Sequence, residues 1–321
     1  MRELSHDDIK QATDRITGHV RPVAVAPADP GAAQVWLALE HLQHTGSFKA
    51  RGAQNFLRAH REEGTLPDAG VTIASGGNAG LACAWAARQQ DVTATVFLPE
   101  TAPRVKVARL RSYGADVRLT GASYAEALAA CQDFAATTGA LASHAYDHPL
   151  IAAGAGTLLE EIHQRIPDLD TVVVSVGGGG LFAGVATAAR HHGIRTVAVE
   201  PENCRALNAA LGAGRVVDTP VDSVASDSLG AARATTLALR AAQHDGVRSV
   251  LVPDEEIIRA RRALWADYRL AVEHAAATAL AALTVEGEGY GYRPVEGERI
   301  CVVLCGANTD VASLAGPDGS A

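Results

Sequence analysis

The segment Thr171–Gly180, with the sequence TVVVSVGGGG, restricts the possible folds of this chain more than any other stretch. Its first six residues are nearly all apolar, which is typical of a strand buried on both faces of a parallel sheet. Four glycines then precede a helix, although glycine loses more conformational entropy on folding than other residues and packing offers no evident reason for four of them. We therefore expect a phosphate site, in which backbone N–H groups and the helix dipole attract the anion. The residues of this loop are Gly177, Gly178, Gly179, Gly180 and Leu181.

Short apolar runs alternate with alanine-rich segments through most of the 321 residues. Strands that alternate with helices predict an α/β fold whose sheets are mainly parallel. A first helix is expected over Ser5–Thr17, with Ser5 as its N-cap. The further strands expected are Val23–Val25, Val35–Leu39, Val71–Ala74, Thr93–Leu98, Asp116–Leu119, Arg195–Val199, Ser249–Val252 and Ile300–Leu304.

Composition and charge narrow the class of protein. Hydrophobic residues make up 48% of the chain and charged residues 20%, which is sufficient for a buried core. The formal net charge of −8 disfavours nucleic acid or an anionic membrane as a partner. No apolar run approaches the roughly 20 residues of a membrane span, and the charged N-terminus lacks a signal-peptide core. Five scattered cysteines without Cys-x-x-Cys pairs indicate reduced thiols, so we expect a cytoplasmic protein.

A lysine stands at the centre of a second distinctive stretch, Thr45–Ala53, in a chain with three lysines among its 28 basic residues. Small residues and a phenylalanine precede Lys49, and an amphipathic segment follows it, which predicts a tight turn that presents an amine at the start of a helix. Desolvation can lower the pKa of a lysine enough for imine formation, whereas arginine stays protonated. A surface lysine after a helix cap is the alternative interpretation.

A third stretch, Ser75–Gly80, follows a predicted strand and opens an apolar helix. Glycines before a helix N-terminus form an anion site, although a plain strand-to-helix turn would also use them.

The stretch Leu39–Ala53, with the sequence LEHLQHTGSFKARGA, resembles the cofactor-lysine signature of the fold-type II pyridoxal-phosphate enzymes, and within them the serine/threonine dehydratase group. The resemblance extends over about Glu3 to Asp310 and rests on four motifs in order. It implies a tryptophan synthase β-like fold, with two open, twisted, mainly parallel sheets flanked by helices. It also implies a large cofactor-binding domain, residues 1–65 and 145–321, into which a small domain, residues 66–144, is inserted. Members are usually dimeric or tetrameric, and we expect a homodimer.

The resemblance assigns roles to single residues. Lys49 holds pyridoxal 5′-phosphate as an imine and later acts as general base, and Phe48 packs near the pyridine ring. The glycine loop 177–180 holds the phosphate, and Asn78 bonds the phenolic oxygen of the cofactor. The substrate carboxylate is bound by the loop that contains Ser75, Gly76, Gly77, Asn78 and Ala79.

Cys305 is placed by the resemblance against the pyridine nitrogen. A neutral thiol is a poor partner for a protonated pyridinium, for which an aspartate is the usual choice. The weaker electron sink favours rapid loss of a β-leaving group. We therefore expect β-elimination from L-threonine or L-serine to a 2-oxo acid and ammonia, with a serine racemase or a dehydratase of a bulkier 3-hydroxy amino acid as alternatives.

A nicotinamide-dependent oxidoreductase is a remote alternative. Gly178-x-Gly180-x-x-Ala183 fits the dinucleotide fingerprint, and Glu200 follows at the spacing of a ribose-binding acid. This interpretation leaves the lysine turn and the Ser75–Gly80 loop unexplained.

Several other polar residues carry weaker expectations. Glu273 stands in a segment like one near the cofactor in the family, but a solvated helix-capping glutamate explains it equally well. Glu200-Pro201 resembles the start of a cation site; Ala206 replaces the second acid of the divalent version, so a monovalent ion near Glu200 is the expectation that remains. The paired histidines His191-His192, and His144 with His148, are interpreted as solvated and are assigned no function.

Overall fold

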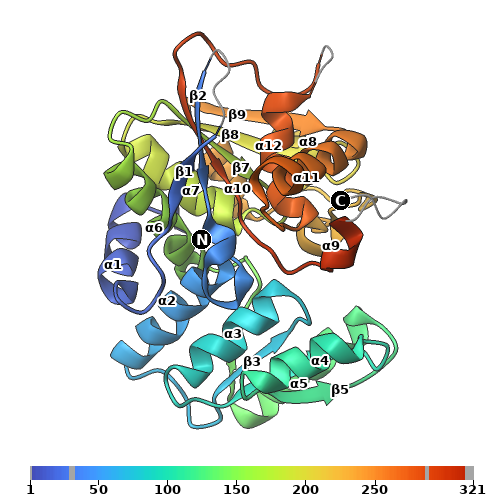
Figure 1. Ribbon diagram of the computed structural model, residues 1–321. Helices are drawn as coiled ribbons and strands as arrows, with labels where there is room; N and C mark the ends of the chain where they lie inside the picture. The colour runs from blue at the N-terminus through green and yellow to red at the C-terminus, as the bar shows by residue number, and fades with distance from the viewer. Residues whose placement is uncertain (1, 29–32, 286–288, 315–321) are drawn as a thin grey trace.

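The structure is a computed structural model that describes residues 2–28, 33–285 and 289–314, whose strands form two sheets (Figure 1). The larger sheet has the order β1-β2-β10-β7-β8-β9, and every neighbouring pair is parallel except β1 with β2. The smaller sheet, β5-β4-β3-β6, is parallel throughout. The predicted α/β class, with two mainly parallel sheets flanked by helices, is confirmed.

The strands follow the predicted apolar runs within one or two residues. They are β1 Val25–Pro27, β2 Gln34–Ala38, β3 Val71–Ala74, β4 Ala94–Leu98, β5 Asp116–Leu119, β6 Leu141–Ala142, β7 Thr171–Ser175, β8 Arg195–Pro201, β9 Val247–Val252 and β10 Arg299–Val303. The sequence analysis missed β6, because two residues are too few to show a periodic pattern.

The longer helices fill the intervals between strands. They are α1 His6–Ile16, α2 Lys49–Glu62, α3 Asn78–Arg88, α4 Arg104–Ser112, α5 Tyr124–Thr138, α6 Pro149–Arg165, α7 Gly180–His191, α8 Ala206–Ala213, α10 Thr236–Ala242, α11 Asp254–Tyr268 and α12 His274–Thr284. The short ones are η1 Glu40–Leu42, η2 His44–Gly46, α9 Ser226–Leu229 and η3 Val311–Leu314. Ser5 caps α1 as predicted, in a reciprocal capping box with Asp8.

Strand order determines which face of the large sheet each helix covers. The chain steps outward from β7 through β8 to β9 and then returns to β10 between β2 and β7. Right-handed crossovers therefore place α7 and α10 on one face and α12 on the other. Contacts agree, since α12 packs along β7, β8, β9 and β10, while α7 packs on β7 and β8 and against α10.

The small sheet uses residues 71–142, and the large sheet uses residues 25–38 and 171–303. The domain boundaries inferred from the sequence, after residues 65 and 144, stay a prediction. No helix within the described ranges is long and apolar enough to cross a membrane.

A buried arginine holds the start of α2 against η1 and α6. The Arg51 guanidinium, 0% exposed, donates to both carboxylate oxygens of Glu40 at 2.6 and 3.1 Å and to both of Glu161 at 2.6 and 3.1 Å. These bonds tie α2 to η1 and to α6. An arginine fork suits two carboxylates because its donors are planar and rigid.

Arg51→Ala is expected to lower the free energy of unfolding by about 3–5 kcal/mol, because it leaves the buried Glu40 carboxylate without its partner. Urea unfolding followed by circular dichroism measures the change. The control is Arg233→Ala, which breaks an exposed pair with Asp218 and should leave stability close to that of the wild type. Equal stabilities for the two variants would contradict the proposed importance of the Arg51 ion pairs.

Candidate active site

The lysine turn is held by the end of β10. Thr45 and Gly46 adopt left-handed backbone conformations, with φ of 63° and 77°, and reverse the chain just before α2. The Phe48 N–H donates to the Cys305 carbonyl at 3.0 Å, and the Ala307 N–H donates to the Gly46 carbonyl at 2.8 Å. The helix then begins at Lys49, as the sequence predicted. The position of the amine is therefore set by backbone bonds to the neighbouring strand end.

The Lys49 amine lies among residues of α2, α3 and the segment 143–145. Its Nζ donates to the Ala145 carbonyl at 3.2 Å and lies 4.5 Å from the centre of the Phe48 ring. Phe48, Lys49, Ala79 and Ala145 line one small cavity. Burial lowers the pKa of Lys49 to about 8, although Cys305 and Glu273 oppose the shift. An amine of this kind is partly neutral near physiological pH and can act as a nucleophile or a base.

The glycine loop leads from β7 into α7. Gly179 has a φ of 97°, a conformation that side-chain-bearing residues rarely adopt. A Cβ on Gly178 would overlap the Tyr146 ring, and one on Gly180 would lie 2.8 Å from the Tyr146 carbonyl oxygen. The idea that packing does not require glycine here was therefore wrong: Tyr146 approaches too closely for side chains. The loop still ends in the first N–H groups of α7, which have no partner inside the helix.

A chain of side-chain hydrogen bonds connects the lysine turn to the loop after β3. Asn308 Nδ2 donates to the Thr45 carbonyl at 2.8 Å and to Asn78 Oδ1 at 2.6 Å. Asn78 Nδ2 in turn donates to Glu273 Oε1 at 2.9 Å and Oε2 at 3.1 Å. These contacts set the orientation of the Asn78 amide.

Glu273 is buried, so its interpretation as a solvated capping residue is wrong. Its side chain is 3% exposed, accepts a hydrogen bond from Ser228 Oγ at 3.2 Å, and lies so close to the Cα of Gly306 that a Cβ there would overlap Oε1. Burial raises the pKa of Glu273 to about 7, against the hydrogen bond from Asn78. The carboxyl group can therefore exchange a proton near physiological pH.

Cys305 occupies the end of β10 beside the lysine turn. Its side chain is 2% exposed, and its Sγ lies 3.6 Å from Ser175 Oγ at the end of β7. Burial raises the pKa of Cys305 to about 12, so the thiol is neutral over the physiological range. A neutral hydrogen-bonding group was expected at this position.

Glu200 has a structural role that the sequence analysis did not foresee. Its two carboxylate oxygens accept the N–H groups of Leu207 and Asn208 at 2.7 and 2.8 Å, so they cap the N-terminus of α8. Burial raises the pKa of Glu200 to about 8, against these two bonds. Because Glu200 is 0% exposed, it does not suit the ribose-binding role required by the dinucleotide alternative. A monovalent ion near Glu200 stays a prediction.

The structure thus brings the predicted lysine, Asn78 and Cys305 to one site. Three contributors were missed: Asn308, Tyr146 and Ser228. Asn308 lies three residues after Cys305, which the resemblance had already identified, so its position was a usable signal. No sequence pattern marks the other two, because they reach the site through loops and a short helix distant in sequence.

The family model described as pyridoxal-phosphate dependent enzyme matches residues 16–306. The chain belongs to the pyridoxal-phosphate-dependent enzymes. It is 36% identical to an L-threonine ammonia-lyase of Geobacter sulfurreducens over 317 residues, which is 97% of this chain and 77% of that protein. It is also 36% identical to a human serine dehydratase-like protein over 283 residues, 85% of each chain.

Solved structures give the same family. The structure of maize serine racemase superposes with a TM-score of 0.90 at 28% identity, covering 98% of this chain and 96% of that one. The processed form of threonine deaminase isoform 2 from Solanum lycopersicum superposes with a TM-score of 0.85 at 26% identity, covering 98% of this chain and 88% of that one.

The residues present fit pyridoxal phosphate. Lys49 supplies an amine whose pKa is lowered, and α7 directs its first N–H groups toward the loop that a phosphate requires. The side-chain hydroxyl groups of Thr45 and Ser47 are buried without a hydrogen-bond partner in the described part of the chain, which leaves polar atoms free beside the lysine. Cofactor chemistry is thus compatible with the donors that the fold brings together.

Glu273→Gln should alter the pH dependence of stability. The folded pKa of about 7 exceeds the ordinary value of 4.5, so the wild type loses stability as pH rises through this window, whereas an uncharged glutamine does not. In cofactor-free protein, the free energy of unfolding of the variant relative to wild type should increase by roughly 3 kcal/mol between pH 4.5 and pH 8. The exposed Glu296→Gln serves as control, and parallel pH profiles for wild type and Glu273→Gln would refute the buried state of this carboxyl.

Proposed function

We propose that the protein removes the β-hydroxyl of L-threonine or L-serine and releases a 2-oxo acid and ammonia. The observation that carries the proposal is the Lys49 amine, whose pKa is lowered by burial to about 8, in a cavity that it shares with Ala79 of the proposed substrate loop. The names of the relatives, L-threonine ammonia-lyase and serine dehydratase-like, support the same reaction.

Each residue of the site has a proposed task. Lys49 holds the cofactor covalently beside Phe48, and the amine, once displaced by the substrate, removes the α-proton. The backbone of the Ser75–Ala79 loop orients the substrate carboxylate. Gly177–Leu181 would hold the phosphate, and the Asn78 side chain would bond the phenolic oxygen. When bound, pyridoxal phosphate supplies an electron sink at the α-carbon.

The neutral groups around the site determine which bond breaks. Cys305 is an uncharged thiol that would face the pyridine nitrogen of the bound cofactor, so the protein would stabilise a protonated ring less than an aspartate would. The electron pair left by removal of the α-proton would then be better accommodated by expulsion of the β-hydroxyl than by delocalisation into the ring. This favours elimination over transamination.

We further infer a cytoplasmic homodimer in which the small domain, residues 66–144, is inserted into the cofactor-binding domain. The buried cysteines, all of them free, agree with a reducing compartment. The separate sheets of the two regions are compatible with the domain division. The partner is a small hydroxy amino acid; neither nucleic acid nor a membrane is proposed.

The first test is covalent capture of the cofactor. Borohydride reduction should fix pyridoxal phosphate on Lys49, located by peptide mass spectrometry, because this amine is the one with a lowered pKa in the site. Lys49→Ala should retain the fold and lose about 10³-fold or more of 2-oxo acid production from L-threonine and L-serine. Lys106→Ala, at an exposed lysine, is the control. Label on Lys10 or Lys106, or turnover by Lys49→Ala, would overturn the assignment.

A second test separates elimination from racemisation, which the similarity to serine racemase makes a real alternative. Racemisation requires an acid on the face opposite Lys49, and Gly76 has no side chain to provide one. A Cβ on Gly76 would lie 2.7 Å from Leu98 Cδ2, so Gly76→Ser combined with Leu98→Val should fit a hydroxyl there and raise D-serine formation above background. Gly77→Ser, at a position where a Cβ meets nothing within 4 Å, is the matched control. Chiral chromatography of L-serine reactions decides, and abundant D-serine from wild type would favour the racemase.

A further inference from the structure

Four histidines gather outside the proposed active site, where α1, α6 and α7 pack together. They are His6, His163, His191 and His192. The rings of His6 and His191 are stacked, with centroids 3.5 Å apart and planes 6° from parallel. The His163 and His192 rings lie 4.1 Å apart. The interpretation of His191-His192 as merely solvated histidines therefore does not describe His192, which is partly buried among other polar side chains.

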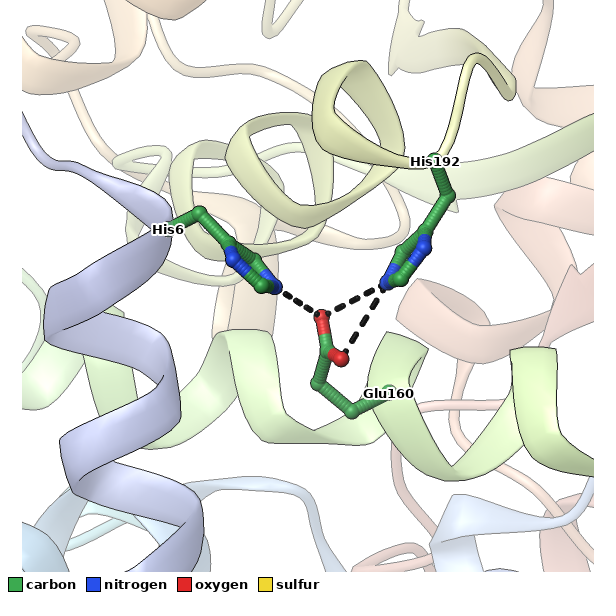
Figure 2. A group of neighbouring side chains, drawn as sticks. All are labelled: His6, Glu160 and His192. Atoms are coloured by element: carbon green, nitrogen blue, oxygen red, sulfur yellow. Dashed lines mark hydrogen bonds and ion pairs between the residues drawn. The ribbon is translucent and has the colours of Figure 1, made fainter.

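Glu160 lies at the centre of this group, between two imidazole nitrogens (Figure 2). Its Oε1 is 3.1 Å from His6 Nε2 and 3.1 Å from His192 Nε2, and its Oε2 is also 3.1 Å from His192 Nε2. One atom from each side chain can be chosen so that all three lie within 4.8 Å of one another. A metal ion bonded at about 2.0–2.2 Å to such atoms holds them roughly 3.0–3.5 Å apart. The nitrogen-to-oxygen distances already have this length.

The surroundings favour a cation with open coordination positions. The side chains of His6, Glu160 and His192 are 21, 17 and 17% exposed, so an ion can enter and water can complete its coordination. His192 is the C-cap of α7, where the helix dipole is negative. Close by, His163 Nδ1 is buried and lacks a hydrogen-bond partner in the described ranges.

We propose that His6, Glu160 and His192 form a binding site for a divalent transition-metal ion of the Zn²⁺ class. Two imidazoles and one carboxylate suit Zn²⁺, Co²⁺ or Ni²⁺, whereas Mg²⁺ and Ca²⁺ prefer oxygen ligands alone. The three ligands come from three different helices, so the ion joins α1 to α6 and α7 and stabilises the folded state by binding to it. If Glu160 only bridged the two histidines by hydrogen bonds and bound no ion, added metal would not stabilise the folded state.

The test uses cofactor-loaded protein without a histidine tag, dialysed against a chelator and then titrated with ZnCl₂ or CoCl₂. Calorimetry should report one ion per chain, bound Co²⁺ should develop visible absorption bands, and the melting temperature should rise with added Zn²⁺. His192→Ala and Glu160→Gln should each weaken binding about tenfold or more and remove the thermal shift, because each loses one ligand. The exposed His19→Ala is the control and should bind like the wild type.

Glu160→Gln is the decisive variant, since glutamine keeps a similar shape and can still hydrogen-bond to both histidines. The cofactor absorbance and circular dichroism of each variant establish that it is folded, and the spectrum of the cofactor should be the same with and without zinc. Wild-type protein that takes up no ion at micromolar concentration would overturn the proposal. Binding by Glu160→Gln with wild-type affinity and Co²⁺ spectrum would do so as well.

Discussion

The buried ion pairs of Arg51 are the interaction on which the active site depends. The lysine turn and the start of α2 are held against η1 and α6 through Glu40 and Glu161. Removing a charged group of this kind from water is costly, and only nearly complete hydrogen bonding offsets the cost. The geometry therefore tolerates little movement of α2. Since Lys49 lies two residues before Arg51, the same restraint fixes the amine.

A second set of hydrogen bonds restrains the lysine turn through the Thr45 carbonyl. The Thr45 carbonyl, the two asparagines Asn308 and Asn78, and the Glu273 carboxyl form a continuous path of hydrogen bonds between four segments far apart in sequence. Every link uses a short side chain or the backbone, so the path has little freedom to stretch. This path of hydrogen bonds connects the turn that carries Lys49 to the loop proposed to bind the substrate carboxylate. One of its members, Asn78, is also proposed to contact the cofactor.

The sequence predicted the order of strands and helices well, because apolar runs and glycine turns are local patterns. It also located Lys49, Asn78 and Cys305, since each lies in a motif that resembles one of the family. It could not predict that Glu200 caps α8 or that Glu273 is buried against Gly306, because both depend on how separate segments pack. Tyr146 was missed for the same reason, and its contact with Gly178 changed the explanation of the glycine loop from phosphate binding alone to phosphate binding and packing.

Burial moves the ionisable groups of the site toward their neutral forms. It lowers the pKa of Lys49 to about 8 and raises the pKa of Glu273 to about 7 and of Cys305 to about 12. A phosphate placed in the glycine loop would consequently be stabilised by N–H groups and the α7 dipole more than by a facing cation. With the neutral Cys305 thiol instead of an aspartate at its nitrogen, a bound pyridine ring would accept less of the electron pair left by removal of the α-proton, and loss of the β-hydroxyl would be favoured. The neutral state of Cys305 and the proposed elimination therefore have one cause, the burial of this side chain away from water.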